Sequence, residues 1–271
     1  MDDNNMLVAT LDILGVSALM QKATPKNVMS IASSIKQTFE AAEQSTRKFF
    51  EESRGLEFME KFSSVLKATT TIYNFSDTMV IVCDLQNTTP ENIKDALMAF
   101  FLQVRFATYE FLVSGYPIRG CIDIGYAYTS KDLIVGKPFV NALKISESLD
   151  FSGVVITPDA FSLFKLYKIS NVAVVLPLEV PTKCGWKTHI CMNWTIESST
   201  TSECSIFSDA HDWQQYLYEK FCANGKQMTQ SALRKLANTS NIVRAFILQN
   251  KVNQCKPNNE TQLRRNYENQ P

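Results

Sequence analysis

Short apolar runs of strand length alternate with longer stretches of helical periodicity along the first two thirds of the chain. The short runs are rich in β-branched and aromatic residues and predict strands at 6–12, 69–75, 79–84, 117–126, 153–157, 169–176 and 188–194. Apolar residues spaced three and four positions apart predict helices over 26–52, from 88–91 onwards, over about 139–149 and, briefly, from Pro158. This order predicts an α+β fold with a ferredoxin-like core, in which helices pack on an antiparallel sheet.

The pattern changes after about residue 205. Residues 211–222 and 229–251 have helical spacing, and Asn224-Gly225 predicts a break between them. The last residues are polar and rich in Asn and Gln, which is typical of a disordered tail. We therefore expect one large domain over residues 1–204, a C-terminal helical extension over 205–252 and a disordered tail over 253–271.

The charge balance and the apolar content limit the classes of partner. Hydrophobic residues make up 45% of the 271 residues, which is enough for a large core. Lys and Arg together number 27, as do Asp and Glu, so no net field draws the protein to nucleic acid or to a membrane surface. No uninterrupted apolar stretch approaches the roughly 18–20 residues of a membrane span. The N-terminus lacks the basic and apolar regions of a signal peptide, and the seven irregularly spaced cysteines fit reduced thiols, so we expect a cytoplasmic protein.

Two carboxylates interrupt otherwise apolar runs of the sequence. Asp12 stands at the end of the first predicted strand, shortly before Gly15, and Asp77 lies at the tip of the hairpin that joins 69–75 to 79–84. A carboxylate in so apolar a run needs a partner, and these two positions are well placed to meet. Two carboxylates with backbone oxygens can hold divalent metal ions against a triphosphate, although a strand-end carboxylate can also cap a helix or turn. The pair indicates a nucleotide-handling enzyme.

Four segments, in order over residues 7–149, resemble the catalytic domain of class III nucleotidyl cyclases. They read Asp12-Ile13-Leu14-Gly15-Val16, Tyr73-Asn74-Phe75-Ser76-Asp77, Arg119-Gly120-Cys121-Ile122-Asp123-Ile124-Gly125 and Gly136-Lys137-Pro138-Phe139-Val140-Asn141-Ala142-Leu143-Lys144. Four residues before the second carboxylate stands Tyr73, where purine cyclases commonly have Lys or Glu. In this the chain is similar to one branch of the family, the pyrimidine cyclases of bacterial Pycsar anti-phage systems.

The resemblance implies a reaction and its setting. A class III cyclase core would convert a pyrimidine nucleoside triphosphate, UTP or CTP, into the 3′,5′-cyclic monophosphate and pyrophosphate. The enzyme would be a homodimer with head-to-tail shared active sites, since this chain carries both halves of a site that the family forms between two chains. The product would be a second messenger that activates a separate effector during phage infection.

The family pattern also implies a metal site and a phosphate-binding turn. Asp12, Asp77 and the backbone carbonyl of Ile13 would hold two Mg²⁺ or Mn²⁺ ions per site. Backbone N–H groups would surround the triphosphate. The turn that carries them comprises Ile13, Gly15, Val16 and Ser17.

Three further side chains would act on other parts of the substrate. Tyr73 would read the base, because a ring with one hydroxyl can narrow the pocket and hydrogen-bond a small base. Arg119 would bind phosphate oxygens through its guanidinium fork, unless it is a surface residue at a strand start. Lys144 stands where the family has an Arg that stabilises the transition state, and a lysine cannot supply the same bidentate contact.

Two departures from the family pattern keep other functions open. Besides Lys144, Val140 occupies the position of a family Asn, and the neighbouring Asn141 is turned by about 100° around the helix. A cyclase-like domain that has lost catalysis and acts as a regulatory module fits these departures, although Asp12 and Asp77 are both retained. An adenylate or guanylate cyclase is the other alternative, because the preference for a pyrimidine depends on Tyr73.

Overall fold

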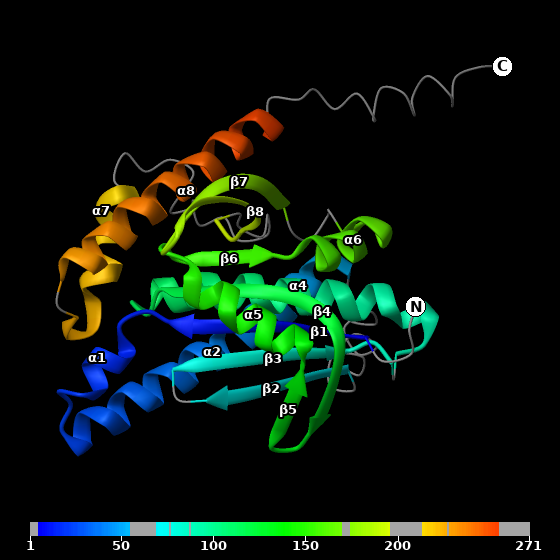
Figure 1. Cartoon of the computed structure of the whole chain (residues 1–271), viewed down its shortest axis with the longest axis horizontal. Coiled ribbons are helices and arrows are strands. Elements are labelled where there is room, and N and C mark those ends of the chain that lie inside the picture. Colours follow the sequence, from blue (N-terminus) through cyan, green and yellow to red (C-terminus); the bar gives the residue numbers. More distant parts are fainter. Residues whose placement is uncertain are drawn as a thin grey trace.

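An eight-stranded, largely antiparallel sheet forms the centre of the protein (Figure 1). The computed structural model describes residues 5–54, 69–75, 77–86, 88–169, 174–195, 213–226 and 228–254. The strands are β1 (Asn5–Ile13), β2 (Thr70–Phe75), β3 (Thr78–Asp84), β4 (Ile118–Ser130), β5 (Leu133–Gly136), β6 (Gly153–Ile156), β7 (Val174–Thr182) and β8 (Gly185–Asn193). Their order is β2-β3-β1-β4-β6-β8-β7, with β5 paired to β4. Only β4 and β6 run parallel among these described pairs.

Three helices complete the larger core on one face of the sheet. They are α2 (Pro25–Arg54), α4 (Pro90–Val113) and α6 (Pro158–Leu166). Leu97 and Phe101 of α4 share this core with Leu11 of β1 and Ile81 of β3, because alternate strand residues point to the same face. Within the described residues α4 is the one helix long and apolar enough to cross a membrane, and 78% of its most apolar stretch is buried inside the protein. A helix that is apolar all round and buried in this way is a core helix.

The opposite face carries the C-terminal extension. This face of the sheet is covered by α5 (Lys137–Ser148) and by the elements of the extension, which are α7 (Trp213–Cys222), the short 3₁₀ turn η2 (Ala223–Gly225) and α8 (Gln230–Gln254). Phe221 of α7 and Phe246 of α8 are buried in one cluster with Phe151, Val155 of β6 and Trp194. Figure 1 shows α8 running across the β7 and β8 end of the sheet. The extension therefore shares a hydrophobic core with the sheet instead of standing apart from it.

The predicted α+β class is confirmed, and most predicted elements match observed ones within a few residues. β4 is longer than predicted because its second half pairs with β5, from Ala127–Gly136 to Ser130–Leu133, and β5 was not predicted. The strand predicted at 169–176 is wrong in its bounds, since β7 begins at 174 and continues to 182. It contains Pro177 and Pro181, which a strand tolerates at the edge of a sheet, where β7 lies.

One short helix was not predicted, and three predicted features lie wholly or mostly outside the described residues. The short helix α1 (Val16–Met20) follows β1 directly and was not predicted. The proposed domain boundary near residue 204 and Ser76 of the predicted hairpin lie outside the described residues. Most of the predicted disordered tail lies outside them as well, because the last residue that the structure describes is Gln254, at the end of α8.

Candidate active site

The end of β1 places Asp12 between strands β3 and β4. In the antiparallel register Asp12 lies opposite Thr78 of β3 on one side and opposite Arg119 of β4 on the other. β1 is buried along nearly its whole length, so its regular pairing fixes where the carboxylate emerges. Asp12 and Arg119 are therefore direct cross-strand neighbours, although they are far apart in the sequence.

Asp77 is tied to the same strand end from the β2–β3 turn. The N–H of Ile13 donates to the carbonyl oxygen of Asp77 at 2.9 Å. The hydroxyl of Ser17, in α1, donates to the Asp77 carboxylate. One backbone bond and one side-chain bond thus hold this hairpin turn against the turn that follows β1.

Arg119 is a largely enclosed side chain that binds three different partners. Its Nε and Nη2 atoms each lie 2.7 Å from the Asp12 carboxylate. Its Nη1 donates to the carbonyl oxygens of Glu147 at 2.9 Å and Leu149 at 3.1 Å, at the end of α5. Only 12% of its side chain is exposed, so the reading of Arg119 as a surface residue does not hold. A planar fork fixed on both sides is a preorganised cation.

A cavity of about 320 Å³ opens where these elements meet. Asp12, Asp77, Arg119, Glu147 and Lys235 all line it. The structure thus brings together Asp12, Asp77 and Arg119, which the sequence analysis had proposed as parts of one site. Glu147 and Lys235 were not predicted, because they come from α5 and α8 and no local pattern marks them.

The carboxylates of this cavity influence one another. Burial raises the pKa of Asp12 above its usual range; the ion pair with Arg119 opposes this shift, and the nearby Asp77 and Glu147 carboxylates add to it. A buried carboxylate with negative neighbours is a group that gains from a bound cation.

The oxygen donors in the cavity fit a divalent metal ion in part. Asp12 and Asp77 offer carboxylate oxygens, the ligands that Mg²⁺ and Mn²⁺ prefer. In the part of the chain that the structure describes, no group of three or more His, Cys, Asp or Glu residues could hold a metal by itself. Further ligands would have to come from the carbonyl of Ile13, which also lines the cavity, from phosphate oxygens and from water.

The turn after β1 has the conformation that a phosphate-binding turn would need. Gly15 has φ of 82°, a left-handed conformation that other residues rarely adopt, and it precedes the first turn of α1. The first backbone hydrogen bond of α1 runs from the N–H of Leu19 to the carbonyl of Gly15. The N–H groups of Val16 and Ser17 come before this bond, at the open start of the helix. Val16 itself is 1% exposed and packs in the core, so only its backbone could contact a ligand.

Tyr73 and Lys144 do not line this cavity in the single chain. Tyr73 is buried on the opposite face of the sheet from α4, its hydroxyl donates to the carbonyl of Ser130 at 2.7 Å, and its ring stacks on Phe75. Lys144 lies on an exposed side of α5, as do Val140 and Asn141. Their predicted roles would require a site completed by a second chain.

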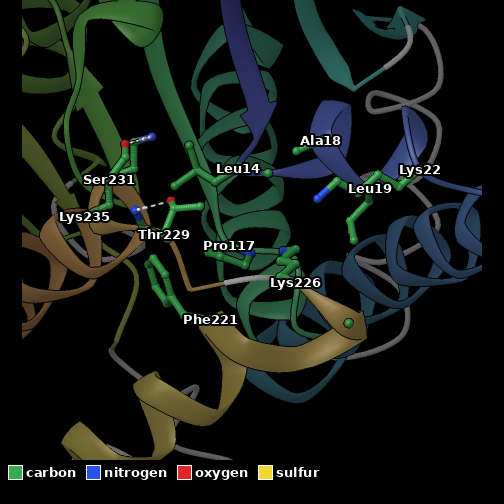
Figure 2. Close-up of a pocket in the computed structure, with 13 residues that line it drawn as sticks. Leu14, Ala18, Leu19, Lys22, Pro117, Phe221, Lys226, Thr229, Ser231 and Lys235 are labelled. Atoms are coloured by element: carbon green, nitrogen blue, oxygen red, sulfur yellow. Dashed lines mark hydrogen bonds between the residues drawn. The ribbon is translucent and has the colours of Figure 1, made fainter.

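A second cavity of about 230 Å³ adjoins the first and has a more apolar wall. Figure 2 shows Leu14 and Pro117 between α8 residues on one side and Leu19 and Lys22 of the β1–α2 connection on the other. Leu14, Gly15 and Lys235 line both cavities. The two cavities therefore meet at the turn after β1.

Lys226 is a buried amine at the second cavity. Its Nζ donates to the carbonyl of Gly115 at 2.8 Å and lies 5.1 Å from the ring centroid of Tyr116. Burial lowers the pKa of Lys226 to about 7. Near neutral pH this lysine can gain or lose its charge with its surroundings.

No protein-family profile and no curated protein matches this chain in sequence. Among solved structures the chain is similar to the guanylate cyclase domain of RhGC from Catenaria anguillulae in complex with GTP, with 13% identity, a TM-score of 0.43, and 70% of this chain and 96% of that chain covered. It is also similar to an adenylate cyclase from Trypanosoma brucei in its monomeric state, with 10% identity, a TM-score of 0.43 and coverage of 70% and 90%. A third match is the non-canonical dimeric guanylyl cyclase domain of the RhoGC fusion protein from Blastocladiella emersonii, with 12% identity, a TM-score of 0.41 and coverage of 70% and 98%.

Proposed function

We propose that the protein is a nucleotide cyclase that converts a pyrimidine nucleoside triphosphate into its 3′,5′-cyclic monophosphate and pyrophosphate. The observation that carries the proposal is the cavity at the end of β1, where Asp12, Asp77 and Arg119 meet beside the turn containing Gly15 and Ser17. Two carboxylates next to a fixed cation and a row of turn N–H groups suit a ligand that combines metal ions with phosphates.

The reaction needs one bond made and one broken at the α-phosphorus. The 3′-hydroxyl passes its proton to water, its oxygen bonds to that phosphorus, and the bond to the bridging oxygen breaks, so that pyrophosphate leaves with that oxygen. Two divalent ions held by Asp12, Asp77 and the Ile13 carbonyl would, when bound, favour the deprotonated hydroxyl and neutralise phosphate charge.

The protein groups around the ions would orient the substrate. Ser17 keeps the Asp77 carboxylate turned toward the β1–α1 turn, and Arg119 holds Asp12 in place while carrying a fixed charge at the cavity. The backbone N–H groups of Val16 and Ser17 would donate hydrogen bonds to phosphate oxygens. Positioning of this kind can account for a large part of the rate enhancement of an intramolecular displacement.

Base recognition would involve Tyr73 of the other chain in a head-to-tail dimer. Its hydroxyl donates to the Ser130 carbonyl in the single chain, and a phenolic oxygen can also accept from an N–H at the edge of uracil or from the amino group of cytosine. Lys144 would lie near the reacting phosphorus from that same chain, as a cation without a bidentate fork. The exposed face of α5 that bears Lys144 is available for such a contact.

An apolar surface supports a second copy of the chain as partner. Tyr126, Tyr128, Leu133 and Val135 lie on one face of the β4–β5 hairpin, and between 48% and 62% of each residue is exposed. We name these four residues the hairpin face. Adjacent exposed aromatic and aliphatic side chains of this kind usually mark an interaction surface.

The cyclic product would serve as a second messenger in anti-phage defence, acting on a separate effector.

The assay that tests the proposal compares the four common nucleoside triphosphates. Purified protein is incubated with ATP, GTP, CTP or UTP and Mn²⁺, and products are identified by mass spectrometry. We expect a cyclic monophosphate from UTP or CTP and loss of product after chelation of the metal. Product from ATP or GTP in preference to both pyrimidines would contradict the substrate class, and no cyclic product from any of the four would contradict the cyclase itself.

A pair of matched variants locates the chemistry. Asp77→Asn keeps the shape of the side chain but removes a metal-binding charge, and we expect it to lower kcat by about 10³-fold or more. Asp159→Asn changes an exposed carboxylate in the first turn of α6 and should retain activity. Equal loss in both variants would disagree with the assignment of Asp77 to the site.

A further inference from the structure

Lys235 of α8 stands at the junction of the two cavities. It is the one cation that lines both of them in the described part of the chain. Its Nζ lies 3.4 Å from the hydroxyl of Ser231, one turn earlier on the same helix, which is a weak contact for an ammonium group. Figure 2 shows this contact on the α8 side of the cavity, across from Leu14. The amine is thus placed at the cavity without a strong acceptor of its own.

Three cations and one carboxylate act on the ammonium group of Lys235. Arg119, Lys183 and Arg234 repel its ammonium group, and Asp150 is the carboxylate that attracts it. Asp150, however, is already bound by Arg234, at 2.5 Å and 3.2 Å to its two oxygens. Arg119 is likewise bound to Asp12, so both of these carboxylates are already paired with an arginine, and a further cation beside them favours a polyanionic ligand.

Contacts on either side of Lys235 fix its position. Arg234 is bound to the Asp150 carboxylate, and the amide of Asn238 donates to the Asp150 carbonyl at 2.8 Å. One residue further, the Thr239 hydroxyl accepts the N–H of Ser152 at 2.8 Å, in a buried position. Asp150 and Ser152 follow α5 and precede β6, so this part of α8 is attached to the body of the sheet close to the residues that hold Arg119.

We propose that Lys235 binds the terminal phosphates of the substrate and the pyrophosphate that leaves, in the same chain that supplies Asp12 and Asp77. This inference rests on the proposed function and adds a residue from the C-terminal extension to it. Asp12 and Asp77 mark the metal side of the cavity, and Lys235 provides a cation on the α8 side. The extension is then a wall of the nucleotide site, and its docking is required for tight binding of the phosphate tail.

The test separates phosphate binding from catalysis by using inorganic tripolyphosphate, which has neither base nor ribose. Its affinity in the presence of Mn²⁺ is measured by titration calorimetry for the wild type, Lys235→Gln, Lys235→Met and Lys235→Arg. Arg244→Gln, at an exposed position of α8 away from both cavities, is the matched control. KM and kcat for the best nucleotide are measured in parallel.

We expect Lys235→Gln and Lys235→Met to weaken tripolyphosphate binding by about tenfold or more, the effect of losing one charged hydrogen bond. The KM for the nucleotide should rise in step, Lys235→Arg should stay within about threefold of the wild type because it keeps the charge, and Arg244→Gln should behave as the wild type. Wild-type binding in both Lys235→Gln and Lys235→Met would overturn the inference, as would an equal loss in Arg244→Gln or no tripolyphosphate binding by the wild type.

The two proposals fail in different ways. If the wild type makes no cyclic nucleotide but binds tripolyphosphate, and Lys235→Gln weakens that binding, the cyclase proposal is wrong and the phosphate site stands. If the wild type is an active cyclase and Lys235→Gln has unchanged affinity and KM, the assignment of Lys235 is wrong and the cyclase proposal stands.

Discussion

Asp12, in the first cavity, and Lys226, in the second, show how burial changes the pKa of a side chain. Asp12 is a carboxylate whose burial and negative neighbours favour protonation, while Arg119 favours the ionised form. Lys226 is the reverse case, an amine whose burial favours the neutral form. In both, the surrounding fold moves the pKa toward the range in which a bound ion could change the protonation state.

The pKa of Lys226 predicts a pH dependence of stability. In the unfolded chain lysine stays charged up to its ordinary pKa of 10.5, whereas in the folded protein it loses its proton above about 7. Between these values the unfolded state binds more protons, so the free energy of unfolding rises with pH, by up to about 1.4 kcal/mol per pH unit. Urea unfolding between about pH 7 and pH 10 should show this rise in the wild type and a smaller one in Lys226→Met.

The control for this measurement is Lys131→Met, in the exposed turn between β4 and β5. It should keep the pH slope of the wild type, because this exposed side chain lines neither cavity. A wild-type slope in Lys226→Met would mean that this lysine remains charged in the folded protein.

Two glycines of strand β4 have different structural roles, although both belong to the same sequence segment. A side chain at Gly120 would lie 2.6 Å from the carbonyl of Thr10 and 2.5 Å from Leu11, whereas one at Gly125 would meet Pro138 at 3.4 Å. We therefore expect Gly120→Ala to destabilise the protein by roughly 1–3 kcal/mol through overpacking against β1, and Gly125→Ala to change stability much less. Urea unfolding of both variants checks this, and equal stability of the two would contradict it.

The attachment of α8 to the sheet depends on a buried hydrogen bond. Thr239 accepts the N–H of Ser152, and its side chain is fully buried. Thr239→Val keeps the shape but leaves that N–H without its acceptor, and we expect a loss of about 1–3 kcal/mol in unfolding free energy. Thr239→Ser should recover most of it, since the hydroxyl remains. If valine and serine are equally stable, the bond contributes little to holding α8.

Across the whole molecule, the hairpin face predicts dimerisation. Val135→Asp places a charge in the middle of the exposed apolar side chains of β4 and β5. By multi-angle light scattering we expect the wild type to be a dimer and this variant to be a monomer with little cyclase activity, because desolvating an unpaired charge opposes association. Leu166→Asp, at an equally exposed apolar residue of α6, should remain dimeric. A monomeric wild type would contradict the shared-site arrangement.

Complementation tests the head-to-tail arrangement directly. Asp77→Asn impairs the metal half of a site, and Lys144→Ala the half proposed to come from the partner. A mixed dimer of the two would have one intact site, so mixing and allowing exchange should restore about a quarter of the wild-type activity. No recovery, with exchange verified, would place both residues in the same half.

The pattern of apolar residues was sufficient to predict the α+β class and most elements, because period-two and helical spacing report local burial directly. It was also sufficient to single out Asp12 and Asp77, since a carboxylate that interrupts an apolar run is costly unless it has a partner. The bounds of β7 and the existence of β5 could not be predicted in this way, because an edge strand with two prolines and a short exposed strand depend on pairing with β8 and β4.

The cavity itself depends on contacts between distant parts of the chain. The sequence alone determined which charged residues stand at strand ends and turns, including Asp12, Asp77 and Arg119, and their roles toward metal and phosphate stay a prediction. Only the tertiary structure decided that Arg119 pairs with Asp12, that Glu147 and Lys235 line the same cavity, and that Tyr73 and Lys144 lie outside it. The physical reason is that strand register and the docking of α8 on Asp150 and Ser152 bring these groups together, and neither leaves a periodic signal in the sequence.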